Sequence, residues 1–324
     1  MYVRVNMLLN WSDEVNLVEY RFNDTPFIIG TILASEPIRG RFYSGKILHE
    51  YNGGFIRMKP EVEELVSKWH DIFISLADQY GLSAQEKLSI AEESEYLMPV
   101  FSERNFIFVC TRLEMKQIVH KIELFLKSAD SLKTKMPEDF LEQLKSALGE
   151  FVCKMKGAQM QSPLPVPDEG ARDISLLAWR ERKDEWGETY CTTYPASFRF
   201  LDLSAQDCLV SYEFSFIREN DNFVTKFHIP DIIRSSKFAE AWCEDLNSLV
   251  QMGCYPQGML INVCERGTLD EFIKQYNAAR RLNGYQLYNE KTSQAINTWS
   301  RYSNRAFIEG RATEDVVDEL SNLL

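Results

Sequence analysis

The sequence predicts an α/β or α+β fold made of two similar domains, each a small sheet packed with long helices. Short runs rich in apolar and β-branched residues come first in each half of the chain, and longer amphipathic segments follow them. A proline-rich segment near the middle of the 324 residues separates the two series. This order of elements is typical of domains in which helices cover a sheet.

The boundary between the two domains is assigned to residues 162–170. Three prolines alternate with other residues in this segment, which excludes a helix and favours an extended connector. We therefore expect an N-terminal domain over residues 1–161 and a C-terminal domain, similar to the first, over residues 171–324.

Strands are expected where short apolar runs are interrupted by polar turns. These runs occupy residues 2–9, 15–22, 27–33, 197–203, 208–217 and 223–229.

A long amphipathic helix is expected over residues 60–80, because its apolar residues share one face and Gly81 is placed to end it. A second such helix should end near Gly253. Three further helix starts are indicated by a hydroxyl residue followed three positions later by glutamate, the spacing of a capping box. These pairs are Ser83 with Glu86, Thr111 with Glu114, and Thr268 with Glu271.

A short pattern at the end of each long helix repeats between the two halves. It consists of Ser75-Leu76, Gly81, Gln85 and Leu88 in the first half, and of Ser248-Leu249, Gly253, Gln257 and Leu260 in the second. Together with the central linker and the shared order of elements, this repeat favours an internal duplication with Gly81 and Gly253 at equivalent helix ends.

The charge balance and the cysteine content limit the possible functions. A net charge of −12 argues against general nucleic-acid binding but leaves a local basic pocket for a nucleotide open. Charged residues interrupt every apolar stretch before the roughly 18–20 residues that a membrane span needs, so no membrane association is expected. The seven scattered cysteines and four histidines lack metal-ligand spacing, which disfavours a metal site and suits a cytoplasmic protein.

Several common enzyme signatures are also missing from the sequence. It contains no Gly-x-Gly-x-x-Gly, no Gly-x-x-x-x-Gly-Lys and no Gly-x-Ser-x-Gly. An ordinary dinucleotide-binding fold, a P-loop enzyme and a serine hydrolase are therefore disfavoured.

The first candidate site lies at Arg39, Arg41 and Ser44. Two arginines separated by one glycine and followed by a hydroxyl suit a phosphate or a carboxylate, because each guanidinium can donate two parallel hydrogen bonds. A solvated turn between strands is the alternative interpretation of the same residues.

The second candidate site lies on the helix that begins near Thr268. Asn277 belongs to this helix, and Gln294 follows seventeen residues later. A side-chain amide can both donate to and accept from the edge of a base. The neighbouring Arg280 and Arg281 fit a solvated helix face as well as they fit an anion site.

The order of these motifs resembles that of the flavin-dependent thymidylate synthases. The resemblance begins with Thr25-Pro26-Phe27 and continues through residues 39–44, a long helix that ends at Gly81, and Thr111. The family signature is Arg-His-Arg, two residues, then Ser. Here Gly40 stands in the place of the histidine.

The second half is similar to the later helices of the same family. Asn277 and Gln294 align without gaps with the family pattern Asn-x-Arg … Arg … Ala-Gln-x-Glu-Ile. Three positions depart from that pattern, because Ala279 and Tyr288 replace its two arginines and Ile296 replaces its glutamate.

The resemblance implies a pyrimidine-nucleotide-modifying protein that transfers one carbon to a deoxypyrimidine monophosphate. FAD would supply hydride and a folate donor would supply the carbon, without a metal. The implied catalytic residues are Arg39 and Arg41, and the implied cofactor-binding residues are Ser44, Asn277 and Gln294. An active protein would be a methyl- or hydroxymethyl-transferase.

Two further functions stay open beside this one. The replaced arginines fit a non-catalytic nucleotide- or flavin-binding relative, and a protein–protein interaction module without a small ligand is the third possibility. The family's sites lie between the subunits of a homotetramer. A tandem chain can pair its own halves and so needs fewer subunits, which predicts a homodimer.

Overall fold

The computed structural model describes residues 2–7, 17–36, 48–50, 59–159, 174–177, 190–207, 210–280 and 290–308. Small antiparallel sheets pack against helices in this part of the chain, which confirms the predicted α/β or α+β class. The expected linker, residues 162–170, lies outside the described residues.

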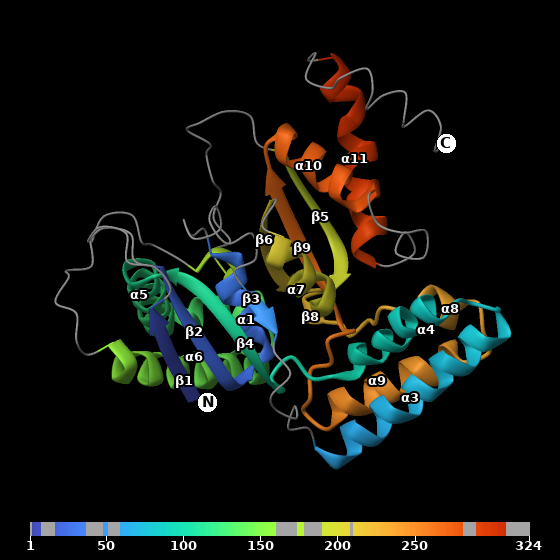
Figure 1. The fold of residues 1–324 in the computed structure, drawn as a ribbon, viewed down its shortest axis with the longest axis horizontal. Helices are drawn as coiled ribbons and strands as arrows, with labels where there is room; N and C mark the ends of the chain where they lie inside the picture. The colour runs from blue at the N-terminus through green and yellow to red at the C-terminus, as the bar shows by residue number, and fades with distance from the viewer. Residues whose placement is uncertain are drawn as a thin grey trace.

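The first sheet belongs to the N-terminal half (Figure 1). Its strand order is β1-β2-β4-β3, and every neighbouring pair is antiparallel. The helices α5 and α6 pack on each other and on this sheet, where the rings of Phe22 in β2 and Phe151 in α6 lie 5.7 Å apart. The elements are β1 (Tyr2–Met7), β2 (Leu17–Pro26), β3 (Leu48–Glu50), β4 (Glu103–Thr111), α5 (Arg112–Ser128) and α6 (Glu138–Gln159).

The second sheet belongs to the C-terminal half and has the antiparallel order β5-β9-β6. The helices α10 and α11 lie beside it (Figure 1), and they are joined by the stacked rings of Tyr276 and Trp299, 5.5 Å apart. The elements are β5 (Tyr190–Ser197), β6 (Ser211–Phe216), β9 (Leu260–Gly267), α10 (Leu269–Arg280) and α11 (Glu290–Ile308).

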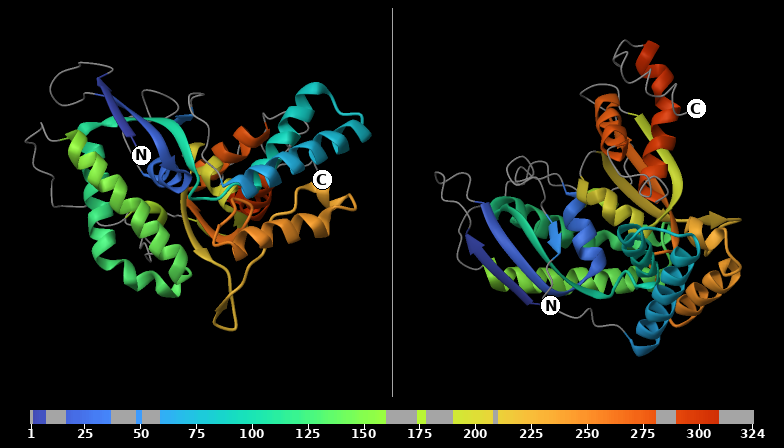
Figure 2. Two further views of the ribbon diagram at one scale, coloured as in Figure 1. Left: turned by 90° about the horizontal axis from the view of Figure 1, so that it is seen from below. Right: turned by 45° about the vertical axis from the view of Figure 1, so that its right-hand side comes forward.

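A group of helices from both halves forms a third part of the molecule, which we call the helical lobe (Figures 1 and 2). Its centre is the contact between Trp69 and Trp242, whose fully buried rings lie 4.8 Å apart, edge to face. The lobe consists of α3 (Pro60–Gln79), α4 (Ala84–Ala91), the 3-10 helix η1 (Glu92–Leu97), α8 (Asp231–Arg234) and α9 (Ala239–Gln251).

Short elements complete the described fold. Two of them, β7 and β8, pair as a small hairpin. The short elements are η2 (Ala129–Thr134), η3 (Ser175–Leu177), β7 (Arg218–Glu219) and β8 (Asn222–Phe223).

Two of the expected strands are helices. Residues 27–33 belong to α1 (Phe27–Ser35) and residues 197–203 fall largely in α7 (Phe198–Asp207). Residues 27–34 are buried on every side of α1, so an apolar, β-branched run without a polar face imitates a buried strand. The run at 223–229 contributes only the end of β8, whereas 208–217 contains β6.

The predicted helix boundaries are confirmed. The helix α3 is followed by Gly81, whose φ of +66° is the left-handed conformation that glycine adopts most readily. Gly253 has a φ of +74° after α9. The three predicted capping pairs all form reciprocal hydrogen bonds between the hydroxyl residue and the glutamate, at Ser83–Glu86, Thr111–Glu114 and Thr268–Glu271.

The two halves repeat one structural plan. The order β2-β4-β3 of the first sheet corresponds to β5-β9-β6 of the second. A helix follows the first of these strands directly in each half, α1 after β2 and α7 after β5. Later in each half comes a long helix that ends at a left-handed glycine, α3 in the first and α9 in the second. A capped helix then follows the next sheet strand, α5 after β4 and α10 after β9. This repetition is what an internal duplication predicts.

Corresponding residues of the two halves meet each other, as they would across a two-fold axis. Trp69 and Trp242 each lie seven residues before the leucine of the shared Ser-Leu pair, and they are in contact. Pro99 and Pro256 each lie four residues before β4 and β9, and they form an antiparallel bridge. The chain therefore pairs its own halves. The repeated glutamine does not correspond structurally, because Gln85 is exposed and Gln257 is buried.

Candidate functional site

The sequence-predicted anion site cannot be placed, because Arg39, Arg41 and Ser44 lie outside the described residues. The structure does place the residues that lead into it. Thr25 and Pro26 end β2, and Phe27 begins α1.

The other two predicted site residues lie on paired helices. Asn277 is on α10 and Gln294 is on α11, and both side chains are half-buried. The Gln294 amide donates to the Thr298 hydroxyl one turn later at 3.4 Å, a long hydrogen bond. Ile296, which replaces the family's glutamate, packs against the hydrophobic core. Each of these helices thus carries one of the two predicted amide side chains, and Ile296 supplies no charge beside Gln294.

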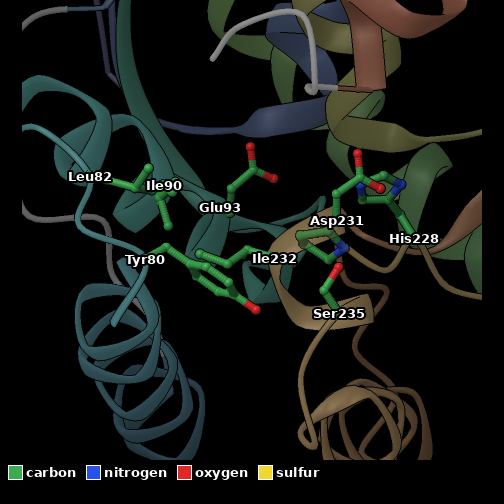
Figure 3. Close-up of a pocket in the computed structure, with 9 residues that line it drawn as sticks. Tyr80, Leu82, Ile90, Glu93, His228, Asp231, Ile232 and Ser235 are labelled. Atoms are coloured by element: carbon green, nitrogen blue, oxygen red, sulfur yellow. The ribbon is translucent and has the colours of Figure 1, made fainter. Parts of the chain in front are cut away.

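The structure also shows a pocket that the sequence did not predict. It has a volume of about 420 Å³ and lies between the two halves. Residues of the N-terminal half form one side and residues 228–235 of the C-terminal half form the other (Figure 3). The lining consists of Tyr80, Leu82, Ile90, Glu93, His228, Pro230, Asp231, Ile232 and Ser235.

The pocket has two chemically different parts. We call Tyr80, Leu82, Ile90 and Ile232 the apolar wall, and Figure 3 shows Glu93 and Asp231 extending into the space beside it. Among the residues that the structure describes, none forms a hydrogen bond or a close ion pair with the Glu93 carboxylate, whereas Asp231 pairs with Arg234 of the same helical turn at 2.9 Å.

The environment of Glu93 favours its neutral form. Burial raises the pKa of Glu93 to about 8, and the negative charges of Glu290, Asp231 and Glu92 act in the same direction. Arg199 opposes this shift, but its guanidinium is engaged by Glu95 at 2.5 Å. Glu93 is therefore a half-buried acid that titrates near neutral pH.

A hydrogen-bonded network fixes the polar end of the pocket. Glu290, the first residue of α11, accepts from the Tyr96 hydroxyl at 3.0 Å and from the Ser197 hydroxyl at 2.5 Å. The His228 ring lies against Tyr96 with centroids 4.7 Å apart, and its Nδ1 is 3.8 Å from a Glu290 oxygen. The network joins η1, the end of β5, α11 and the segment before α8, so it holds the two sides of the pocket together.

The sequence contained only a weak signal for this pocket. Glu92, Glu93 and Glu95 form a short acidic run directly after a capped helix, and an acidic run is more often a solvated surface. His228 and Asp231 lie more than 130 residues away in the sequence. Only the pairing of the two halves brings them to Glu93.

Comparisons of the chain with models of protein families, with curated proteins and with solved structures return no match. Within the described residues, no group of histidine, cysteine, aspartate or glutamate side chains could hold a metal ion. No helix in that part of the chain is long and apolar enough to cross a membrane.

Proposed function

We propose that the protein binds a pyrimidine nucleotide and is a diverged, tandem relative of the flavin-dependent thymidylate synthases. The proposal rests on the order of the strands and helices around the residues that match the family pattern. Thr25-Pro26 ends β2, Phe27 begins α1, Gly81 follows α3 and Thr111 caps α5. Asn277 and Gln294 occupy the paired helices α10 and α11. The same plan in both halves supports the tandem part of the proposal.

The residues matched to the family favour binding over full catalysis. FAD would supply hydride and a folate the carbon, if both bound. Ala279 and Tyr288 stand at the positions of two family arginines, and the partly buried Ile296 packs against the hydrophobic core. Without these two arginines and the glutamate, the C-terminal half lacks the charged side chains that the family pattern places there. One-carbon transfer is the enzymatic form of the proposal, and nucleotide or flavin binding without turnover is the other form.

Calorimetric titration with deoxyuridine monophosphate tests the binding proposal. We expect Arg39→Ala and Arg41→Ala each to weaken binding by about ten- to a hundredfold, because each removes a charge-assisted contact worth roughly 1.5–3 kcal/mol. Lysine at either position should restore only part of the affinity, since it cannot reproduce the bidentate geometry. The exposed Arg112 provides the control, and Arg112→Ala should leave affinity unchanged.

Two further measurements separate the forms of the proposal. A flavin absorption spectrum of the purified protein tests FAD binding, and turnover of the nucleotide with a folate donor tests one-carbon transfer. If neither the nucleotide nor FAD binds below millimolar concentration, the proposal is wrong and an interaction module becomes the better interpretation.

We also propose a homodimer and a cytoplasmic location. Large apolar side chains such as Leu88, which is 67% exposed, remain on the surface and support association. Free thiols at the described cysteines support a reducing compartment. Light scattering that gives the single-chain mass of 37.7 kDa at every concentration would reject the dimer.

A further inference from the structure

The pocket between the halves differs in chemistry from a phosphate site. Among the described residues, its lining contains two carboxylates and no lysine or arginine. Two guanidinium groups that act on these carboxylates are already engaged, Arg199 by Glu95 and Arg234 by Asp231. A phosphate placed here would meet the Asp231 carboxylate and, above the pKa of Glu93, a second negative charge, so the described lining disfavours the anionic end of a nucleotide.

The geometry favours a ligand that is both cationic and apolar. The volume of about 420 Å³ is within the range of small-molecule sites, and the apolar wall lies beside the two carboxylates. Glu93 has no hydrogen-bond partner among the described residues, so an ammonium group could donate to it without displacing another contact. Tyr80 adds an aromatic ring on which a cation can also rest.

We propose that this pocket binds the ammonium group of a small organic amine, with Glu93 as its counter-ion and the apolar wall against its hydrocarbon part. Asp231 provides a second, more exposed carboxylate. The site is independent of the proposed nucleotide site, because it shares none of the residues assigned to that site.

Proton release should accompany binding. Four charged groups act on Glu93, and His228 also lines the pocket. They are Arg199 of α7, Glu290 of α11, Asp231 of α8, and Glu92, which precedes Glu93 in η1. Because the pKa of Glu93 is about 8, the empty pocket holds a proton at neutral pH. The ammonium group binds the carboxylate form, so affinity should rise by about twentyfold from pH 6.5 to pH 8.5.

Phenethylamine is the probe, and 2-phenylethanol is its neutral counterpart of the same shape. We expect calorimetry at pH 8.5 to show that the amine binds at least tenfold more tightly than the alcohol. Titration at pH 7 in two buffers of different ionisation enthalpy should show release of a proton. Equal binding of amine and alcohol, absence of amine binding, or an affinity that does not change with pH would each overturn the proposal.

Variants locate the site without affecting the nucleotide test. Glu93→Gln should weaken amine binding at pH 8.5 by about tenfold and abolish its pH dependence, and Asp231→Asn should weaken it less. Glu240→Gln, at an exposed position of α9 in the same lobe, is the matched control and should change affinity by less than twofold. An equal loss in the control would contradict the assignment of Glu93. Deoxyuridine monophosphate titrations of the same variants should be unchanged, so failure of one site is distinguishable from failure of the other.

Discussion

The two halves share a plan and differ in how they connect the long helix to the following strand. After Gly81 the N-terminal half inserts α4 and η1 before β4, whereas six residues, 254–259, join Gly253 to β9. The pocket is lined by residues of this insertion, including Ile90 and Glu93. The two halves thus share a plan, and Glu93 comes from elements that follow the long helix in only one of them, within the described residues.

The halves also differ at corresponding positions of their first helices. Thr31 is the fifth residue of α1, and Asp202 is the fifth residue of α7. They meet in a 2.5 Å hydrogen bond, and Asp202 also binds Arg104 of β4 through two contacts at 2.9 and 3.2 Å. The N-terminal half therefore provides the cation and the C-terminal half provides the anion. This buried pair makes the association of the halves specific.

The largest expected effect comes from breaking this ion pair. Arg104→Leu should lower the free energy of unfolding by about 3–5 kcal/mol, because it leaves Asp202 as a buried charge without its counter-ion. Urea denaturation measures the change. The double variant Arg104→Leu with Asp202→Leu should recover much of the loss, since both charges are then removed. A loss below about 1 kcal/mol in the single variant would show that the pair does not hold the halves together.

A smaller effect is expected from the pH dependence of Glu93. Burial raises the pKa of Glu93 to about 8 in the folded protein, above the value near 4.5 in the unfolded chain. The stability that the neutral carboxyl contributes is therefore fully present below pH 4.5. That stability is lost as the pH rises through 8. The full shift would correspond to about 4 kcal/mol between pH 4.5 and pH 9. Because the side chain is only partly buried and solvent screens its charge, Glu93→Gln should be more stable than the wild type at pH 9 by about 2 kcal/mol, relative to their difference at pH 4.5.

Urea denaturation at the two pH values provides this comparison, with Glu240→Gln as the control. The control should keep the wild-type pH dependence. If Glu93→Gln also keeps it, Glu93 is ionised at little cost in the folded protein and is not a titrating group of the pocket.

The tryptophan contact tests the symmetry of the lobe. A double-mutant cycle with Trp69→Leu and Trp242→Leu should give a coupling energy of about 0.5–1.5 kcal/mol, the usual contribution of an edge-to-face pair beyond its buried area. Additive single effects would mean that each ring stabilises only its own half. Trp69 paired with the more distant Phe140 is the non-contacting control, and its cycle should be additive.

Local signals predicted more of this molecule than long-range ones. The capping pairs and the left-handed glycines were predictable, because their contacts lie within a few residues of one another. The helix α1 was not predictable, because burial on all sides removes the periodicity that identifies a helix. The helix α7 has an exposed position at Leu203, but its short run of apolar residues directly after β5 predicts a strand. The pocket could not be predicted because Glu93 and His228 meet only when the halves pair. The proposed role of Arg39 and Arg41 stays a prediction.

The smallest expected effect tests whether Gly81 and Gly253 are equivalent. Both have a left-handed φ, +66° and +74°, and a Cβ built on either would meet no atom within 4 Å. Alanine at either position should therefore lower the free energy of unfolding through backbone strain alone, by about 1 kcal/mol. Asparagine, which tolerates this conformation, should lower it less.

Gly30→Ala provides the contrasting case, because its Cβ would lie 2.2 Å from the Arg104 guanidinium, an atom of the buried ion pair. Thermal and urea denaturation of the three alanine variants make the comparison. Similar small losses at Gly81 and Gly253, with a larger loss at Gly30, are what two copies of one helix end require. A loss at Gly253 several times that at Gly81 would mean that the shorter connection to β9 strains its glycine more, and that the two helix ends, although alike in conformation, do not have the same energetic role.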